Sequence, residues 1–400
     1  MKVLVHGFYG AGNAGDDAIL AGIIAQVRRE LKPAGVVVSA YAQRTPIAAG
    51  DPGVTTVSGR DLGALHDAVM ECDAVIVGGG GLFQDYHGFD LRRAVQEPLA
   101  TGLGGTAVGY YGIPIFLGRL GGKPTMLYGV GVGPLRNPVA GRLAGWLGSS
   151  ADAVTVRDAL SAELLRERGV SGVEVTADPA LALNQQESGG VPGPAGEWLA
   201  GLRDRPVIGL NLRSWAFGEA AHASPQQVYL ALADHLRQKH GARFVILPLN
   251  ASPREQQLAE ALAFQIGPED CLVVPYQGDL TGLLALYPKL DLMVGMRLHA
   301  SVLALVSGVI PVGLAYDRKV SSFFSDLGLP ELCPILDEAK PDSLIPPADD
   351  ALARGPALRR RLAKALVGLR RREAGNHQEL GRICPQGLPP ARNRAGGPTG

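Results

Sequence analysis

Along the chain, short apolar segments end in glycine or just before a charged residue and give way to helical patterns. Such junctions follow the segments that end at Gly7, Gly78, Gly131, Leu212, Gly295 and Ala315. Strands that alternate with helices are typical of a parallel sheet covered by helices on both faces. In these sheets, ligands bind beyond the carboxyl ends of the strands. The sequence therefore predicts an α/β protein whose functional residues lie at these junctions.

The alternation is interrupted by residues 185–197, which lack periodicity and are rich in glycine, proline and polar residues. Because 400 residues are too many for one ordinary core, we interpret this segment as a linker between two lobes. The predicted N-terminal lobe covers residues 1–184, and the C-terminal lobe covers residues 198–345. A basic helix is expected within residues 346–380, before a disordered tail over 381–400. The expected architecture is two Rossmann-like lobes that face a cleft.

Charge and cysteine content exclude several classes of protein. Basic and acidic residues number 38 each, and the formal net charge of +0 argues against bulk nucleic-acid binding. The four cysteines lack CxxC spacing, and no histidine or carboxylate spacing indicates a metal site. We expect a cytoplasmic protein without a signal peptide or membrane span. The basic stretch Arg359–Arg372 leaves open a contact with the inner face of a membrane, although such helices are more often solvated.

The strongest functional signal lies between Asp291 and Lys319. An apolar strand ends at Gly295, and Arg297 and His299 follow at the start of a helix. A second apolar strand leads to Lys319. Helix N-termini attract anions, arginine offers a planar fork to carboxylate or phosphate, and histidine transfers protons near neutral pH. The cluster predicts a pocket for a small, doubly anionic substrate that needs acid catalysis.

Structural roles remain open for these cations and for two further arginines. Arg157 and Arg213 each follow a predicted strand, where anion binding and a simple ion pair are equally plausible. Arg157 would then pair with Asp158 or a surface acid. For Arg297 and Lys319, the alternative is an ion pair with a nearby acid, namely Asp291, Asp317 or Asp326.

The first glycine-rich loop resembles a dinucleotide-binding fingerprint but carries the wrong charges for one. Its G-x-G-x-x-G pattern is formed by Gly10, Gly12 and Gly15. Asp16 and Asp17 place carboxylates where a pyrophosphate would lie, and no ribose-binding acid follows the next strand. A pocket for sugar hydroxyls, with Asn13 or Asp16 as acceptors, is favoured over dinucleotide binding. Plain helix capping is the alternative.

Four consecutive glycines, Gly78–Gly81, end another buried strand. Ordering four glycines costs conformational entropy, so a close approach of the backbone to some other group is expected. We interpret Gly79 and Gly80 as part of a ligand-facing loop on the acceptor side. A tight crossing of a helix over the strand is the alternative.

Taken together, the motifs resemble those of the polysaccharide pyruvyl transferase family, in particular its cell-surface-anchoring subgroup. They occur in order from residue 7 to about residue 324 and read GFYGAGNAGDDAIL, VIVGGGGLFQD, YGVGVGPL, TVRDALSAELL, ADPAL, GMRLHASVLAL and GLAYDRKVSSFF. The resemblance implies a glycosyltransferase-B-like fold and a donor, phosphoenolpyruvate, held mainly by the C-terminal lobe. It implies no cofactor. The implied product is a 4,6-ketal of pyruvate on N-acetylmannosamine, within a lipid-linked cell-wall polysaccharide precursor that anchors surface-layer proteins.

The family's R-L-H motif falls on Arg297, Leu298 and His299, and its lysine falls on Lys319. Arg157 and Arg213 match the family's donor-binding arginines less closely. In this assignment His299 supplies or shuttles a proton, and an acid such as Asp16 deprotonates an acceptor hydroxyl. Two other classes stay open: a nucleotide-sugar glycosyltransferase of the same architecture, and a non-catalytic sugar-binding regulator.

Overall fold

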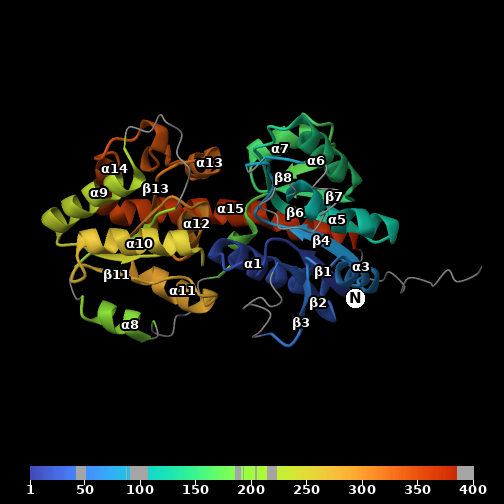
Figure 1. Cartoon of the computed structure of the whole chain (residues 1–400), viewed down its shortest axis with the longest axis horizontal. Helices are drawn as coiled ribbons and strands as arrows, with labels where there is room; N and C mark the ends of the chain where they lie inside the picture. The colour runs from blue at the N-terminus through green and yellow to red at the C-terminus, as the bar shows by residue number, and fades with distance from the viewer. Residues whose placement is uncertain are drawn as a thin grey trace, which may run out of the picture. The chain divides into compact units, whose positions relative to one another are not determined.

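The computed structural model describes residues 1–41, 51–86, 88–90, 107–184, 191, 193–202, 205–213 and 223–384. The chain divides into two compact units (Figure 1). The first unit comprises Met1–Gly10, Ile19–Ala182 and Arg372–Gly400, and the second comprises Ala11–Ala18 and Leu183–Arg371. Residues 11–18, which the sequence places in the N-terminal lobe, therefore group with the second unit.

The first unit is built on a parallel sheet with the strand order β3-β2-β1-β4-β6-β7-β8, and β5 pairs with β6. The strands are β1 (Lys2–His6), β2 (Gly35–Ala40), β3 (Val54–Ser58), β4 (Ala74–Gly78), β5 (Gly81–Phe83), β6 (Thr125–Val132), β7 (Ala153–Val156) and β8 (Val173–Val175). The central strands β4, β6 and β7 are buried along their whole length. Such continuous apolar runs are expected when helices cover both faces of a parallel sheet.

The helices of this unit are α1 (Ala14–Leu31), α3 (Leu62–Glu71), α5 (Ala107–Leu120), α6 (Pro138–Ser150), α7 (Ala159–Arg166) and the 3-10 turn η1 (Pro179–Ala182). The sequence does not predict α5, because its apolar residues lie on nearly all sides and it carries Pro114. The packing of α5 against α6 explains why one of its residues is a glycine. A Cβ atom at Gly112 would lie 2.6 Å from Cδ2 of Leu147 on α6, so glycine permits the close contact of α5 and α6.

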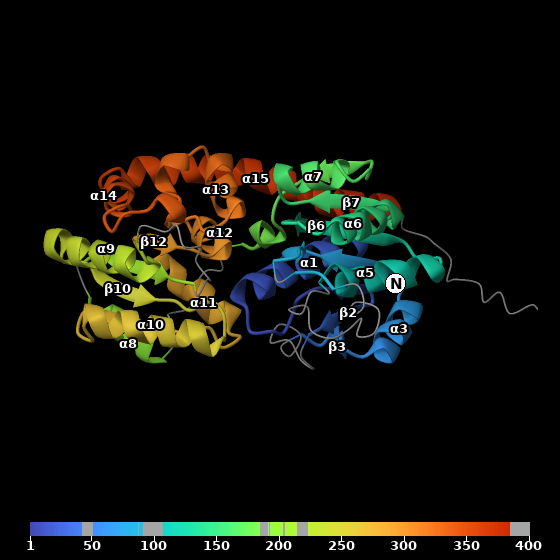
Figure 2. The ribbon, with the colours of Figure 1, turned by 45° about the horizontal axis from the view of Figure 1, so that its top comes forward.

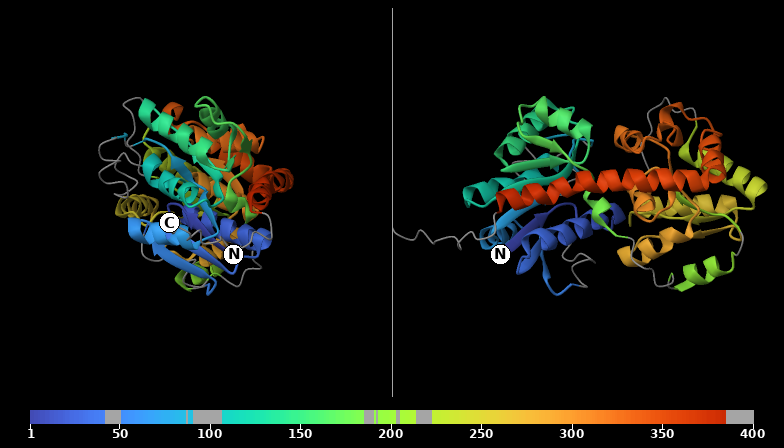
Figure 3. Two further views of the ribbon diagram at one scale, coloured as in Figure 1. Left: turned by 90° about the vertical axis from the view of Figure 1, so that its right-hand side faces the viewer. Right: turned by 180° about the vertical axis from the view of Figure 1, so that it is seen from behind.

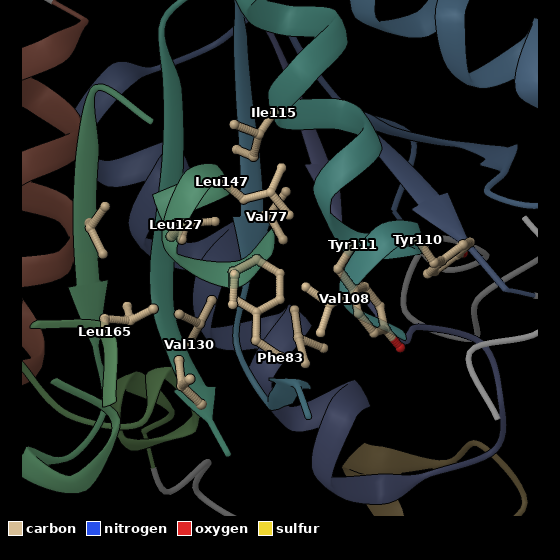
Figure 4. Close-up of a cluster of buried hydrophobic side chains, with 14 of the residues drawn as sticks. Val77, Phe83, Val108, Tyr110, Tyr111, Ile115, Leu127, Val130, Leu147 and Leu165 are labelled. Carbon is tan, nitrogen blue, oxygen red and sulfur yellow. The ribbon is translucent and has the colours of Figure 1, made fainter. Parts of the chain in front are cut away.

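An apolar cluster packs this sheet against α3, α5, α6 and α7 (Figure 4). Phe83 lies at its centre in the close-up, with Val77 and Leu127 from the sheet and Leu147 from α6 around it. All four side chains are 3% exposed or less. Burying side chains of this size stabilises the fold by about 1.5–3 kcal/mol each, which fixes the sheet that carries the glycine-rich strand ends.

The second unit contains a parallel sheet with the strand order β11-β10-β9-β12-β13. Its strands are β9 (Val207–Asn211), β10 (Arg243–Ile246), β11 (Cys271–Val273), β12 (Leu292–Gly295) and β13 (Ile310–Gly313). Its helices are α8 (Gly193–Ala200), α9 (Pro225–His240), α10 (Pro253–Ile266), α11 (Leu280–Leu286), α12 (Leu298–Val306), α13 (Arg318–Asp326) and α14 (Ile345–Ala353). The alternation of strands and helices matches the predicted one.

The C-terminal helix α15 (Gly355–Ile383) is one long helix, seen most clearly from behind (Figure 3). It is preceded by α14, so the predicted basic segment 346–380 holds two helices rather than one. The predicted tail, 381–400, overlaps the end of α15, and residues 385–400 lie outside the described residues. Of the predicted linker, the last five residues form the start of α8. Within the described ranges, none of the helices combines the length and the apolar character needed to span a bilayer.

Buried polar side chains join the last turns of α15 to the first unit. Asn376 accepts hydrogen bonds from the hydroxyls of Thr155 and Thr176, at 2.6 and 2.7 Å. Glu373, which is 1% exposed, accepts one from Nε2 of Gln26 at 3.2 Å. Burial raises the pKa of Glu373 to about 7, an effect that its hydrogen bonds only partly oppose.

The raised pKa of Glu373 predicts a pH-dependent stability. The carboxyl loses its proton near pH 4.5 in the unfolded chain but near pH 7 in the folded one. The protein should therefore lose up to about 3 kcal/mol of unfolding free energy as the pH rises from 4.5 to 7, and none beyond. Glu373→Gln removes this loss, so the variant should gain stability relative to the wild type between pH 5 and pH 8 in urea unfolding. Parallel pH profiles for the two proteins would contradict the assignment.

Candidate active site

Three strands of the second unit end side by side and carry the predicted donor-binding residues. Gly295 of β12 is in register with Asn211 of β9 and with Gly313 of β13. Because parallel strands end at the same edge of a sheet, the residues that follow these positions emerge together. Arg213 follows β9, Arg297 and His299 follow β12, and Lys319 follows β13. Helices α12 and α13, which start at this edge, lie close together (Figure 2).

Arg297 is held by an acid that the sequence did not point to. It is the N-cap residue of α12, and its backbone N–H donates to Oδ1 of Asn211 at 3.1 Å. Its guanidinium forms a two-pronged ion pair with Glu255 in the first turn of α10, with Nε 3.1 Å from Oε2. The alternative of an ion pair is thus correct for Arg297, but its partner is Glu255 and not Asp291, Asp317 or Asp326. Since Glu255 is 5% exposed, the pair fixes the guanidinium in place.

Tyr316 lies close to two of the predicted donor-binding cations. The guanidinium carbon of Arg213 is 4.9 Å from the centre of the Tyr316 ring, and Nη1 donates to the hydroxyl. Nζ of Lys319 is 5.5 Å from the same ring centre. Burial acts to raise the pKa of Tyr316, but Lys319, Arg213 and Arg297 together outweigh it and lower that pKa below its ordinary value. Three cations are therefore close enough to act on one phenol.

Asp317 contacts the backbone of Lys319. It is the N-cap of α13, and its side chain accepts the backbone N–H of Lys319 at 2.9 Å. This cap fixes the first turn of α13 and with it the starting point of the lysine side chain.

His299 lies in the first turn of α12, partly buried, against the first turn of α1. A Cβ atom added to Gly15 would lie 2.5 Å from Cγ of His299 and closer still to Nδ1. Real Cβ atoms do not approach other atoms so closely, so only glycine allows this contact. The third glycine of the supposed dinucleotide fingerprint thus makes room for the imidazole.

The segment 11–18 is attached to the second unit by backbone hydrogen bonds. The N–H of Ala14 donates to Leu249 at 2.9 Å, and the N–H of Ala251 donates to Gly12 at 2.8 Å. The side chain of Asn13 accepts the N–H of Gly15 at 3.0 Å. Asn13 therefore caps α1, which begins at Ala14.

The two acids of this loop consequently stand in a helical first turn, where carboxylates interact favourably with the helix dipole. Asp16 is partly exposed. Asp17 is buried and accepts a hydrogen bond from the hydroxyl of Tyr276 at 2.6 Å. Asp16 is thus the acid of the pair that is more open to solvent, beside the glycine that contacts His299.

The remaining predicted site residues lie in the first unit. Arg157 is buried and pairs with Asp178 at 3.3 Å and Asp158 at 3.4 Å. Burial acts to lower its pKa, but the two acids outweigh it and raise that pKa. Gly79 has a left-handed φ of 64°, and a Cβ atom there would overlap Cγ2 of Ile19 on α1. Gly80, with φ 73°, accepts the N–H of Gly131 at 2.7 Å.

Gly79 therefore lies at a tight crossing of a helix over a strand, and Arg157 forms an ion pair. The sequence left both of these structural roles open as alternatives. Within the second unit, by contrast, the structure brings Arg213 and Lys319 together around Tyr316, and brings His299 against the segment that carries Asn13 and Asp16. Among the described residues, no group of three or more histidines, cysteines and carboxylates is placed to hold a metal ion.

Four residues of this site were not predicted from the sequence. Tyr316 lies inside the quoted motif GLAYDRKVSSFF, and Asn211 lies two residues before Arg213, so their proximity to the charged residues was a usable signal. Glu255 and Tyr276 lie in segments without any motif. Their contacts with Arg297 and Asp17 span 42 and 259 residues of sequence, respectively, and only the packing of distant elements reveals them.

The chain is similar in sequence and fold to proteins of saccharide metabolism. It is 22% identical to the amylovoran biosynthesis protein AmsJ of Erwinia amylovora, across 92% of this chain and 95% of AmsJ. HepE of Anabaena, solved with UDP-glucose, has a similar structure with a TM-score of 0.60, at 14% identity over 96% of this chain and 99% of HepE.

Two further solved structures share the fold. The UDP-GlcNAc 2-epimerase of Neisseria meningitidis matches with a TM-score of 0.58, at 14% identity over 96% of this chain and all of that chain. The trehalose-6-phosphate synthase OtsA also matches at 0.58, with 13% identity over 98% of this chain and all of OtsA. At these identities the likeness concerns the fold alone. It confirms the predicted glycosyltransferase-B-like fold with two Rossmann-like units.

The family model for polysaccharide pyruvyl transferases matches residues 13–318. This span starts at the residue that caps α1 and ends at the first residue of α13, so it includes Arg297 and His299. It covers well over half of the 400 residues. The prediction from the motifs is confirmed at this level: the chain belongs to the polysaccharide pyruvyl transferase family.

Proposed function

We propose that this protein transfers the pyruvyl group of phosphoenolpyruvate to a sugar of a polysaccharide precursor, forming a ketal and releasing phosphate. The observation that carries the proposal is the group of Arg213, Arg297, Lys319 and His299 at one sheet edge of the second unit. The first, second and fourth of these lie within the segment that matches the family, and Lys319 directly follows its last residue. A donor with a carboxylate and a phosphate needs several fixed cations, and the enol carbon needs a proton source. Membership of the family and the similarity to AmsJ support the same reaction class.

The contacts of the cations suggest that they have different roles in donor binding. Arg297 forms an ion pair with Glu255, and Arg213 and Lys319, which both lie close to the ring of Tyr316, take the donor's phosphate or carboxylate. His299 protonates the terminal enol carbon, which makes its neighbour electrophilic. Asp16 accepts a proton from an acceptor hydroxyl. Asn13, Gly79 and Gly80 remain proposed acceptor contacts, and Arg157 a proposed donor contact.

The finer identity of the acceptor is also part of the proposal. N-acetylmannosamine of a lipid-linked cell-wall precursor, ketalised at positions 4 and 6 for the anchoring of surface-layer proteins, is the acceptor that the motif resemblance favours. The test is to incubate the protein with phosphoenolpyruvate and a panel of lipid-linked or aryl-tagged aminosugars, and to follow phosphate release and the mass of the saccharide. Phosphate release coupled to one added pyruvyl group on a single aminosugar is the expected result.

The same panel separates the alternatives. Supplying nucleotide sugars in place of phosphoenolpyruvate tests for a glycosyltransferase. We retain this alternative because the chain shares its fold with HepE and OtsA. Release of a nucleoside diphosphate with glycosyl transfer would replace the proposal by that function. Saccharide binding without turnover of either donor would instead favour a non-catalytic regulator.

We further propose that an exposed stripe of α15 touches an anionic membrane surface near a lipid-linked acceptor. Arg360, Lys364 and Arg371 are exposed and recur at helical spacing, with Val367 60% exposed between them. No acidic side chain among the described residues forms an ion pair with these three. Arg359 and Arg361, in contrast, lie 3.9 Å from Asp291 and 3.8 Å from Glu331.

Removing two charges from this stripe should weaken vesicle binding. Because each basic residue near an anionic surface contributes about 1 kcal/mol, Arg360→Gln with Arg371→Gln should lower the partition onto phosphatidylserine vesicles by about 30-fold. The matched control, Arg359→Gln with Arg361→Gln, should change it much less. Sedimentation with anionic and neutral vesicles measures both. Equal effects of the two pairs, or no binding by the wild type, would refute the contact.

A further inference from the structure

We propose that Tyr316 is a second proton carrier of the active site, which gives its phenolic proton to the departing phosphate and regains one from the acceptor. The inference rests on the proposed pyruvyl transfer and adds a residue to it. Its basis is the position of the Tyr316 hydroxyl against Arg213 and of its ring close to both Arg213 and Lys319, the two cations proposed to hold the donor's anionic groups.

The backbone holds Tyr316 firmly at this place. The residue before it, Ala315, donates its N–H to Pro334 at 2.9 Å and accepts the N–H of Leu336 at 2.9 Å. The residue after it, Asp317, caps α13. Tyr316 is thus anchored on both sides at the end of a strand, the position where ligands bind in this class of sheet.

The charge around the phenol of Tyr316 differs from that around two buried tyrosines of the same unit. Burial raises the pKa of Tyr287 and of Tyr229. At Tyr316 burial acts in the same direction, but Lys319, Arg213 and Arg297 outweigh it and the pKa falls below the ordinary value. The cations therefore make the phenolate form accessible, as a residue that loses and regains a proton requires.

The reaction contains two proton donations that two carriers can share. Two acceptor hydroxyls lose a proton each, while the terminal enol carbon gains one and the departing phosphate gains the other. An imidazole that has just protonated carbon can protonate phosphate only after it has regained a proton, whereas a second carrier already holds one. His299 and Tyr316 together supply the two donations.

The proposed steps balance. The first sugar oxygen loses its proton to Asp16 and bonds to the central carbon of phosphoenolpyruvate as His299 protonates the terminal carbon, which gives a phosphorylated tetrahedral intermediate. The proton taken by Asp16 restores the one given by His299 before the next turnover. The bond from that carbon to the phosphate oxygen then breaks, the electron pair leaves with the phosphate, and Tyr316 protonates the departing oxygen. Arg213 and Lys319 stabilise the phenolate. The second sugar oxygen bonds to the same carbon, and its proton returns to Tyr316.

The test is Tyr316→Phe, which keeps the ring against both cations and removes only the hydroxyl. With phosphoenolpyruvate and the acceptor found active, kcat should fall by ~10²–10⁴-fold with little change in the KM for phosphoenolpyruvate. Tyr287→Phe, a buried tyrosine of the same unit outside the site, serves as the matched control and should retain full activity. A raised KM with an unchanged kcat, or wild-type kinetics, would overturn the role of Tyr316.

A second variant keeps the proposal testable if Tyr316→Phe does not fold. A ring-fluorinated tyrosine at position 316 lowers the phenol pKa at almost constant size. The limb of the kcat–pH profile that reports this group should then move to lower pH, and an unmoved profile would overturn the assignment. A wild-type protein that releases no phosphate with any acceptor would refute the pyruvyl transfer itself and the role of Tyr316 with it, whereas an active wild type with an unaffected variant refutes Tyr316 alone.

Discussion

Replacing His299 by alanine is expected to lower turnover of phosphoenolpyruvate by ~10²–10⁴-fold. The imidazole stands at the start of α12, at the strand ends from which Arg213 and Lys319 emerge, and it is the residue proposed to protonate the enol carbon. Its loss removes the proton source while the cations that bind the donor stay in place. The affinity for phosphoenolpyruvate, measured by calorimetry, should therefore change little, whereas kcat should fall strongly.

Two controls make this result specific. His66→Ala removes a histidine from the exposed face of α3 in the first unit and should leave kcat unchanged. Free imidazole added to the His299→Ala variant should restore part of the activity, because the truncated side chain leaves space for it. Normal turnover of the variant would show that the proton comes from elsewhere, and loss of donor binding would show that His299 serves binding instead.

Replacing Gly15 by alanine is expected to lower turnover by about 10²-fold, the scale of loss that follows a displacement of about 1 Å at a catalytic group. The new Cβ atom would lie 2.5 Å from Cγ of His299 and 3.0 Å from its Cβ atom. Since the clash reaches the base of the side chain, a rotation of the imidazole alone does not relieve it. The overpacking should also cost about 1–3 kcal/mol of unfolding free energy.

The same substitution elsewhere and a double variant separate this effect from a general loss of stability. Gly368→Ala on α15 adds a Cβ atom with no other atom within 4 Å and should be neutral. In the His299→Ala background, Gly15→Ala should have little further effect on kcat, because the group it displaces is already gone. Additive losses in the double variant would mean that Gly15 acts on catalysis through some other contact.

Much of the fold follows from local sequence patterns. Buried parallel strands such as β4 and β12 read as short apolar runs that end in glycine, and amphipathic helices such as α9 read as periodic ones. These signals arise from the geometry of a single element and need no knowledge of its neighbours. The helices α5 and α6 were missed because α5 is apolar on nearly every side and both are rich in glycine.

In the candidate site, too, some features follow from the local sequence and others only from the tertiary structure. The sequence alone determined that Arg297 and His299 stand at a strand-to-helix junction of an α/β fold, and that Arg213 and Lys319 follow other strands, because the end of a parallel strand is a locally encoded position. Only the tertiary structure decided that Glu255 holds Arg297, that Tyr316 lies close to two cations, and that Gly15 of a distant loop packs on His299. These partners come from different elements, and which side chains meet depends on how the elements pack, a property that no short stretch of sequence carries.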